Sequence, residues 1–374
     1  MSNPISVTIL TGSVSEVTAR VCDRVLQTGV DLRVAAILPR KSRKKGQSFD
    51  GVTVVPTTER FARLGKGCSC CTVRSDLMTK VQKIAEGQTA DHIVIQASPQ
   101  SDLRTLAKTF TVADHDGAIL SDVARIEGFV AVIDAGRFMD KLETEAGRNQ
   151  IESIEMANVV VVDGASTVTS VKYDHVVSII AAINPTARVE RADSGQFNLS
   201  SLRVDEPFDL DVVEERLMDM GAASAGEAEP AIISRFVYEE RRPFHPGRLY
   251  AVLHESWAGV IRAQGSFWVA SRPEFARTLD VAGGSHKSSC SGMWWATVPE
   301  AQRPESPEFR RYAESIWHPE FGDRHQALSF VGCDVDEADM RVRLDRCLLT
   351  EDEISDSDRW SSMPDPFDWP ENPA

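Results

Sequence analysis

The sequence of 374 residues lacks any apolar run as long as the roughly eighteen residues that a helix needs to cross a bilayer. Its start, Met1–Leu10, lacks the basic residues and the long apolar segment of a secretory signal. The sequence therefore predicts a cytoplasmic protein that has no membrane partner.

Positive charge is scarce, with 41 Lys and Arg against 56 Asp and Glu and a net charge of -15. A strongly acidic chain repels nucleic acid, so no nucleic-acid partner is expected. Cysteine is also scarce for a disulfide framework, because only seven are present in a chain of this length. In a reducing compartment, clustered thiols are typical of metal binding or redox chemistry.

Short apolar runs alternate with helical patterns over residues 1–190. The expected strands are Ile5–Leu10, Leu32–Leu38, Val52–Val55, His92–Gln96, Phe129–Asp134 and Asn158–Asp163, and the expected helices are Val17–Thr28, Asp76–Glu86 and Val171–Ile183. Such alternation predicts an α/β domain, a mostly parallel sheet with helices on both faces.

The composition changes after residue 190. Residues 191–230 are polar, acidic and rich in small residues, which predicts a linker containing one amphipathic helix near Leu210. Residues 231–350 predict a smaller α+β domain, and the Asp- and Pro-rich residues 351–374 predict a loose acidic tail. The elements expected in the smaller domain are Ile232–Tyr238, Val260–Ala270, Met293–Val298 and Leu328–Val331 as strands, and Pro246–Trp257 and Asp336–Leu348 as helices.

Three cysteines fall within four residues, in Gly67-Cys68-Ser69-Cys70-Cys71-Thr72. The expected helix from Asp76 places them just before a helix N-terminus, where the helix dipole and the nearby Arg74 favour thiolates. Cys68 and Cys70 are spaced for chelation of a soft or borderline metal, whereas two adjacent cysteines chelate one ion awkwardly. Cys68, Cys70 and Cys71 are therefore the predicted metal ligands of an incomplete site that can release its ion. Thiol redox chemistry is the alternative.

The first strand, turn and helix have the outline of a phosphate-binding loop. Counting from Gly12, the position of the loop lysine is Thr18 and that of the magnesium-binding hydroxyl is Ala19. Glu16 adds negative charge where a phosphate would lie. The residues therefore favour a plain strand–turn–helix over a working nucleotide loop.

Other chemistry-bearing residues have simpler interpretations. His245 precedes Pro246 and is interpreted as a helix cap, His318 and His325 are candidates to supplement a metal site, and the basic run Arg40–Lys45 is either a solvated loop or a patch for an acidic partner. The isolated Cys22, Cys290, Cys333 and Cys347 are interpreted as packing residues.

The chain resembles the CobW-type family of metallochaperone GTPases over nearly its full length. Gly67–Arg74 matches the family's metal motif, and four later phrases match its C-terminal domain in order: Arg242–Pro246 with Arg248-Leu249, Gly259 with Arg262–Ala270, Trp294-Trp295, and Gly322–Gln326 before Phe330–Gly332. The resemblance implies a P-loop-GTPase-like domain followed by a smaller C-terminal domain.

The departures from the family pattern fall on the nucleotide motifs. The family's Lys-Thr-Thr is here Thr18-Ala19-Arg20, its Glu-Thr-Ser-Gly is Gln96–Pro99, and its guanine-reading Asn-Lys-x-Asp is Asp163–Ser166. Its Asn-Glu-Phe-Gly switch is replaced near Pro39–Lys45. The resemblance therefore implies a pseudo-GTPase, with GTP binding unlikely and GTPase activity absent or very weak.

Within the family, the chain is similar to activators of iron-type nitrile hydratase, which carry Cys-Ser-Cys-Cys. This resemblance implies a maturation factor that delivers a metal ion, iron or zinc, to a client metalloenzyme such as a nitrile hydratase subunit. Two alternatives stay open: a zinc-handling CobW-type GTPase with unusual nucleotide motifs, and a thiol-redox maturation factor.

Overall fold

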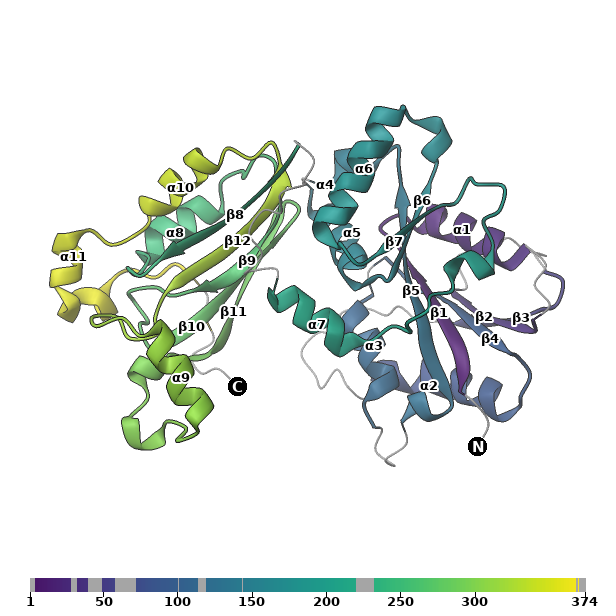
Figure 1. Ribbon diagram of the computed structural model, residues 1–374, viewed down its shortest axis with the longest axis horizontal. Helices are drawn as coiled ribbons and strands as arrows, with labels where there is room; N and C mark the ends of the chain where they lie inside the picture. The colour runs from purple at the N-terminus through teal and green to yellow at the C-terminus, as the bar shows by residue number, and fades with distance from the viewer. Residues whose placement is uncertain are drawn as a thin grey trace. The chain divides into compact units, whose positions relative to one another are not determined.

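The computed structural model describes residues 4–27, 32–39, 49–57, 72–99, 101–113, 119–142, 144–219, 232–367 and 369. The chain divides into two compact units, Met1–Leu217 and Met218–Ala374 (Figure 1). Each unit has its own sheet and its own apolar core, so each is described by itself.

The first unit is built on a seven-stranded sheet in which every pair of neighbouring strands is parallel, in the order β3-β2-β4-β1-β5-β6-β7. The strands are β1 (Ile5–Thr11), β2 (Val34–Pro39), β3 (Val52–Thr57), β4 (His92–Gln96), β5 (Ala124–Asp134), β6 (Val159–Asp163) and β7 (Arg188–Arg191). Strands such as β4 and β6 are buried at every position, as expected where helices cover both faces. The predicted α/β fold is therefore confirmed.

Helices lie on both sides of this sheet (Figure 1). They are α1 (Ser15–Gln27), α2 (Thr72–Glu86), α3 (Leu103–Thr111), α4 (Phe138–Leu142), α5 (Glu145–Met156), α6 (Ser170–Ile183) and α7 (Leu210–Asp219). The α1 stripe predicted from the sequence is buried, with Val17, Val21 and Val25 in the core. Because all strands are parallel, their carboxyl ends meet at one edge, which is where such folds place their ligands.

The segment that follows β7 belongs to the first unit. Phe197, Leu199 and Leu202 pack into the core cluster that includes Val21 of α1. The expected amphipathic helix is present as α7, which buries Leu210 and Leu217. A linker was expected over residues 191–230. The structure differs from this expectation as far as Leu217, because that part of the segment belongs to the first unit. The acidic composition suggested a linker, but apolar residues spaced along it are enough to bind the segment to the sheet.

The second unit is a five-stranded antiparallel sheet in the order β11-β10-β9-β12-β8. Its strands are β8 (Ile233–Glu240), β9 (Val260–Phe267), β10 (Phe275–Ala282), β11 (Ser285–Met293) and β12 (Gln326–Cys333), and its helices are α8 (Pro246–Leu253), α9 (Pro307–Ile316), α10 (Glu337–Asp345) and α11 (Glu351–Ser355). Leu249 of α8 and Leu344 of α10 pack in one core with Phe330 of β12.

One strand of this sheet was predicted in the wrong place. Residues 293–298 were expected to be a strand, but β11 ends at Met293 and Trp295–Thr297 form a turn of 3₁₀ helix. The hairpin of β10 and β11 was missed, because the Ser-rich β11 lies at the sheet edge and lacks the apolar alternation of a half-buried strand.

The acidic C-terminal segment also differs from the loose tail expected over residues 351–374. Glu353 pairs with Arg248 at 2.7 Å, and Trp369 belongs to the core of the second unit. Phe367 packs against that core, and its ring stacks on Trp369 with centroids 4.5 Å apart. Aromatic residues placed among the acids anchor this segment, since each buries a large apolar area.

No helix within the described ranges is long and apolar enough to span a membrane.

Candidate functional site

The turn between β1 and α1 lies at the carboxyl edge of the first sheet and is short. Only Gly12, Ser13 and Val14 separate the two elements, because α1 already begins at Ser15. A phosphate loop needs an open stretch of backbone N–H groups at this place. Here the chain is helical three residues before the lysine position, and the N–H of Thr18 donates to the carbonyl of Val14 at 3.0 Å. A side chain at Gly12 would meet the Val132 carbonyl oxygen at 2.6 Å, so the turn is closely packed.

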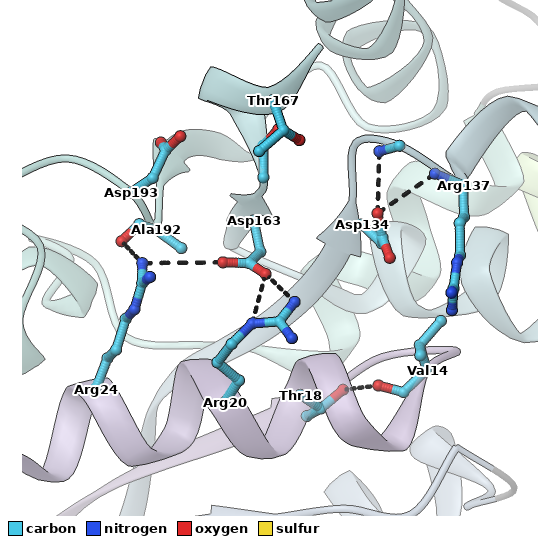
Figure 2. A network of polar contacts seen from close by, with 12 residues as sticks. Val14, Thr18, Arg20, Arg24, Asp134, Arg137, Asp163, Thr167, Ala192 and Asp193 are labelled. Carbon is cyan, nitrogen blue, oxygen red and sulfur yellow. Dashed lines mark hydrogen bonds and ion pairs between the residues drawn. The ribbon is translucent and has the colours of Figure 1, made fainter.

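Thr18 occupies the lysine position and is turned into its own helix. Its side chain is buried, and its Oγ1 donates to the carbonyl of Val14 at 3.1 Å (Figure 2). Ala19, the next residue, has no hydroxyl to offer a magnesium ion. The side chains at these two positions therefore do not fit a Mg²⁺–GTP complex, which needs an ammonium group and a hydroxyl there.

An ion pair joins α1 to the end of β6. Arg20 donates to the Asp163 carboxylate through Nε at 3.0 Å and through Nη2, while Arg24 Nη1 lies 3.9 Å from the other carboxylate oxygen. Both arginines point from α1 toward Asp163, as Figure 2 shows. Asp163 is 6% exposed, whereas Arg20 is 52% exposed, so the carboxylate is the buried partner. Arg24 also donates to the Ala192 carbonyl at 2.5 Å, which ties the segment after β7 to the same cluster.

The carboxylates at or near the neighbouring strand ends accept hydrogen bonds from backbone N–H groups of the adjoining turns. Asp134 closes β5 and accepts the N–H groups of Gly136 at 2.9 Å and Arg137 at 3.3 Å. Asp193 accepts the N–H of Ser166 at 2.5 Å. Burial opposes ionisation of Asp193, but the hydrogen bonds from Ser166 and Arg191 outweigh it and hold the pKa of this carboxyl below its usual value. The carboxylates of this edge are therefore committed to the protein itself.

Sequence reasoning named Arg20 and Asp163 only as departures from motifs and missed their pairing. A signal was present, since two motifs that meet at one edge of a parallel sheet had changed to side chains of opposite charge. Gln96, which replaces the family's acid, lies buried at the end of β4.

Cys68, Cys70 and Cys71 lie outside the described residues, and so does the basic run Arg40–Lys45. Helix α2 begins at Thr72, directly after Cys71, rather than at the expected Asp76. The three cysteines therefore immediately precede a helix N-terminus along the sequence.

The remaining candidates are placed by the structure. His245 caps α8, since its Nδ1 accepts the N–H groups of Gly247 at 3.1 Å and Arg248 at 3.3 Å, which confirms the capping interpretation. Across the part of the chain that the structure describes, His318 and His325 belong to no group of three potential metal ligands. Cys22 and Cys347 are buried, as packing residues are.

Two family descriptions match the chain. Residues 6–191 match the CobW/HypB/UreG nucleotide-binding domain, and residues 233–348 match the cobalamin synthesis protein cobW C-terminal domain. The chain belongs to the CobW family. The boundaries of the two matches fall within the two units, so this CobW-type chain has the two domains of the family in their usual order.

Curated relatives of this CobW-type chain include proteins with zinc in their names. The chain is 27% identical over 336 residues to zinc-regulated GTPase metalloprotein activator 1 of Dictyostelium discoideum, covering 83% of this chain and 70% of the relative. It is 28% identical over 342 residues to a zinc chaperone of Mycobacterium tuberculosis, covering 85% and 82%. A solved structure, the Zn(II)-bound YjiA GTPase from E. coli, matches with a TM-score of 0.42 and 14% identity, over 93% of this chain and all of that one.

Proposed function

We propose that this protein is a metallochaperone that carries a metal ion on Cys68, Cys70 and Cys71 and passes it to a client metalloprotein without hydrolysing GTP. Its membership of the CobW family and the names of its relatives support the metal-handling part of the proposal. The thiolate chemistry of three clustered cysteines supports the choice of ligands.

The Arg20–Asp163 ion pair is the observation that carries the nucleotide part of the proposal. Asp163 stands where the family reads guanine, and its carboxylate is held by a guanidinium from α1. Thr18 supplies a hydroxyl that is already bonded to Val14 instead of a charge for phosphates. Base and phosphate positions are therefore both filled by interactions within the chain, which favours an ion transfer that needs no nucleotide.

Two arguments point to different metal ions, and the first of them also points to a client. The Cys-Ser-Cys-Cys motif resembles that of activators of iron-type nitrile hydratase, so we propose iron as the cargo and a nitrile hydratase subunit as the client. Zinc is the second candidate, favoured by the relatives named for zinc and by the higher affinity of thiolates for zinc than for Fe(II).

Metal content decides between these candidates and tests the ligands. The parent and the Cys68→Ser, Cys70→Ser and Cys71→Ser variants are purified alone and after co-expression with iron-type nitrile hydratase, and iron and zinc are measured in both proteins. We expect the first two variants to lose the metal and to leave the client inactive. The Cys71→Ser variant should keep metal and deliver it poorly, because an extra thiolate lets the ion change partners without passing through water.

Cys333→Ser is the matched control, since it removes a thiol from β12 of the second unit. Normal client maturation by all three motif variants would refute metal delivery through this motif. If a client co-expressed with the motif variants gains metal normally while its own cysteines stay unmodified, the thiol-redox alternative is favoured.

Calorimetry with Mg²⁺–GTP tests the nucleotide part separately. The parent protein should show no binding at micromolar concentrations. Micromolar binding would refute the pseudo-GTPase part and restore the zinc-handling GTPase alternative, while leaving the cysteine test unaffected.

A further inference from the structure

The second unit holds a buried guanidinium that forms no ion pair with a described residue. Arg277 on β10 is 2% exposed, and its Nε and Nη1 have no hydrogen-bond partner in the described part of the chain. An arginine stays charged in proteins, although burial lowers the pKa of Arg277. Its Cζ lies 4.1 Å from the ring centroid of Trp369 and 5.5 Å from that of Phe275, so aromatic rings cover it. Rings attract a cation but leave its N–H donors without an acceptor.

The nearby carboxylate of Asp365 is engaged elsewhere. Its Oδ2 accepts from Ser271 Oγ at 2.7 Å and from Trp369 Nε1 at 3.1 Å, and it lies 3.8 Å from Arg272 Nε. It influences Arg277 only through its charge. The buried donors of Arg277 therefore need another acceptor.

Cys290 is placed to become that acceptor. It lies on the edge strand β11 as the register partner of Arg277, and directly opposed residues of an antiparallel pair have their side chains on the same face. Its thiol is reduced and half-buried, and it donates a weak hydrogen bond to the Gly292 carbonyl at 3.6 Å. Burial lowers the pKa of the Arg277 guanidinium, and Cys290 is near enough that a charge on its sulfur would raise it.

We propose that Cys290 is a modification site, a thiol that lies opposite the buried Arg277 guanidinium and reacts with peroxides and other soft electrophiles. With hydrogen peroxide, a sulfur electron pair attacks one oxygen, the O–O bond breaks and hydroxide leaves, taking up a proton to become water. The sulfur is oxidised by two electrons to a sulfenic acid, and the peroxide is reduced. The new oxygen is an acceptor of the kind that Arg277 Nε and Nη1 lack.

The other described cysteines lack this combination of access and charge. Burial raises the pKa of Cys22 to about 12 and that of Cys347 to about 11, which keeps both as unreactive thiols. Cys333 is half-buried like Cys290, but its register partner is Ile233. Cys333 is therefore the internal control, a half-buried thiol whose register partner carries no charge.

Alkylation kinetics on the full chain test the proposal. The protein is treated with iodoacetamide between pH 6 and pH 9, and the modification of Cys290 and Cys333 is followed by peptide mass spectrometry, which separates both from the Cys68–Cys71 cluster. At pH 6.5 we expect Cys290 to react about tenfold faster than Cys333, because the Arg277 guanidinium attracts the negative charge that the attacking sulfur carries. Equal rates would overturn the proposal.

Arg277→Gln and Arg277→Lys show whether the charge is responsible. The glutamine variant should bring Cys290 down to the rate of Cys333, and the lysine variant, which keeps the charge, should hold it above that rate. If circular dichroism shows that the glutamine variant does not fold, the alkylation rates of Cys290 and Cys333 in the parent and the lysine variant decide whether the charge is responsible. A folded lysine variant in which the two cysteines react equally would overturn the role of Arg277.

Trapping with dimedone after treatment with hydrogen peroxide reports the oxidised product. Dimedone should label Cys290 in the parent and leave Cys333 unlabelled. Label on Cys333 and none on Cys290 would contradict the assignment of the site.

Discussion

Arg20 of the first unit and Arg277 of the second unit show two ways of holding a guanidinium at a sheet. Arg20 is half-exposed and bonded to a buried carboxylate at the end of β6. Arg277 is buried and covered by Trp369, and two of its nitrogens lack hydrogen-bond partners among the residues that the structure describes. The first arrangement pairs opposite charges at the carboxyl edge of a parallel sheet, where such folds usually bind ligands. The second leaves hydrogen-bonding capacity unused beside a thiol.

The comparison shows that buried polar groups with hydrogen-bond partners and those without them support different conclusions about function. A buried polar group without a partner costs about 1–3 kcal/mol, so its retention calls for an explanation. The fully paired edge of the first unit favours a structural role for residues that replaced nucleotide motifs. The unpaired donors of the second unit favour an acceptor that forms only when Cys290 is oxidised.

Removing the aromatic cover of Arg277 should have the largest effect on stability. Trp369→Ala removes a side chain that is 7% exposed and also the ring over the cation. We expect the free energy of unfolding of the second unit to fall by about 3 kcal/mol. All seven tryptophans lie at or beyond Trp257, so tryptophan fluorescence in urea follows this unit alone.

Trp317→Ala is the matched control for this measurement. Trp317 is 40% exposed, and its removal should change stability by less than about 1 kcal/mol. Equal midpoints for Trp369→Ala and the parent would show that the C-terminal segment contributes no stability to its unit.

The first unit should lose stability in acid through His92. Burial lowers the pKa of His92 to about 4, while the charge of Glu127 opposes this shift, and Thr8 Oγ1 lies 2.9 Å from His92 Nε2. The unfolded chain takes up the proton near pH 6.5 and the folded chain only near pH 4. The stabilisation from neutral His92 is therefore complete above about pH 6.5 and is lost as the pH falls toward 4, up to about 3 kcal/mol.

Urea unfolding followed by far-ultraviolet circular dichroism between pH 4.5 and pH 7.5 checks this expectation. His92→Gln cannot take up the proton, so its stability should vary less over this range. Parallel curves for parent and variant would exclude His92 as the source of the pH dependence.

Breaking the ion pair of the first unit should have a smaller effect, because Arg20 is half-exposed. We expect Arg20→Ala to lower the free energy of unfolding by about 1 kcal/mol, since it leaves Asp163 buried with Arg24, 3.9 Å away, as its remaining described ion-pair partner. A double-mutant cycle with Asp163→Asn measures the coupling directly. A coupling near zero would mean that the pair adds nothing to the stability of this edge.

The pairing of Arg24 with Asp163 should have the smallest effect of the series. Arg24 is 42% exposed and lies 3.9 Å from Asp163, at the limit of an ion pair. In a double-mutant cycle of Arg24→Ala with Asp163→Asn we expect a coupling below about 0.5 kcal/mol, which excludes the separate loss of the hydrogen bond from Arg24 to the Ala192 carbonyl. A coupling larger than that of Arg20 with Asp163 would reverse the assignment of the main partner of Asp163.

The sequence by itself determined the α/β class, the buried strands and the positions of most helices. A continuous apolar run such as Val159–Val162 is typical of a strand whose two faces are both covered. The spacing of Val17, Val21 and Val25 puts all three side chains on one face of a helix. It also located the lost phosphate-loop residues, because chemistry at Thr18 and Ala19 depends on side-chain type alone.

The tertiary structure alone decided which distant residues meet. Arg20 and Asp163 are 143 positions apart, and only the parallel order of β1, β5 and β6 brings them together. Residues 192–202 and Trp369 have the composition of a linker and a tail, yet each packs into a core whose other members come from elsewhere in the chain. Local patterns report backbone preference and amphipathicity, whereas pairings across a sheet depend on strand order and register, which no single segment encodes.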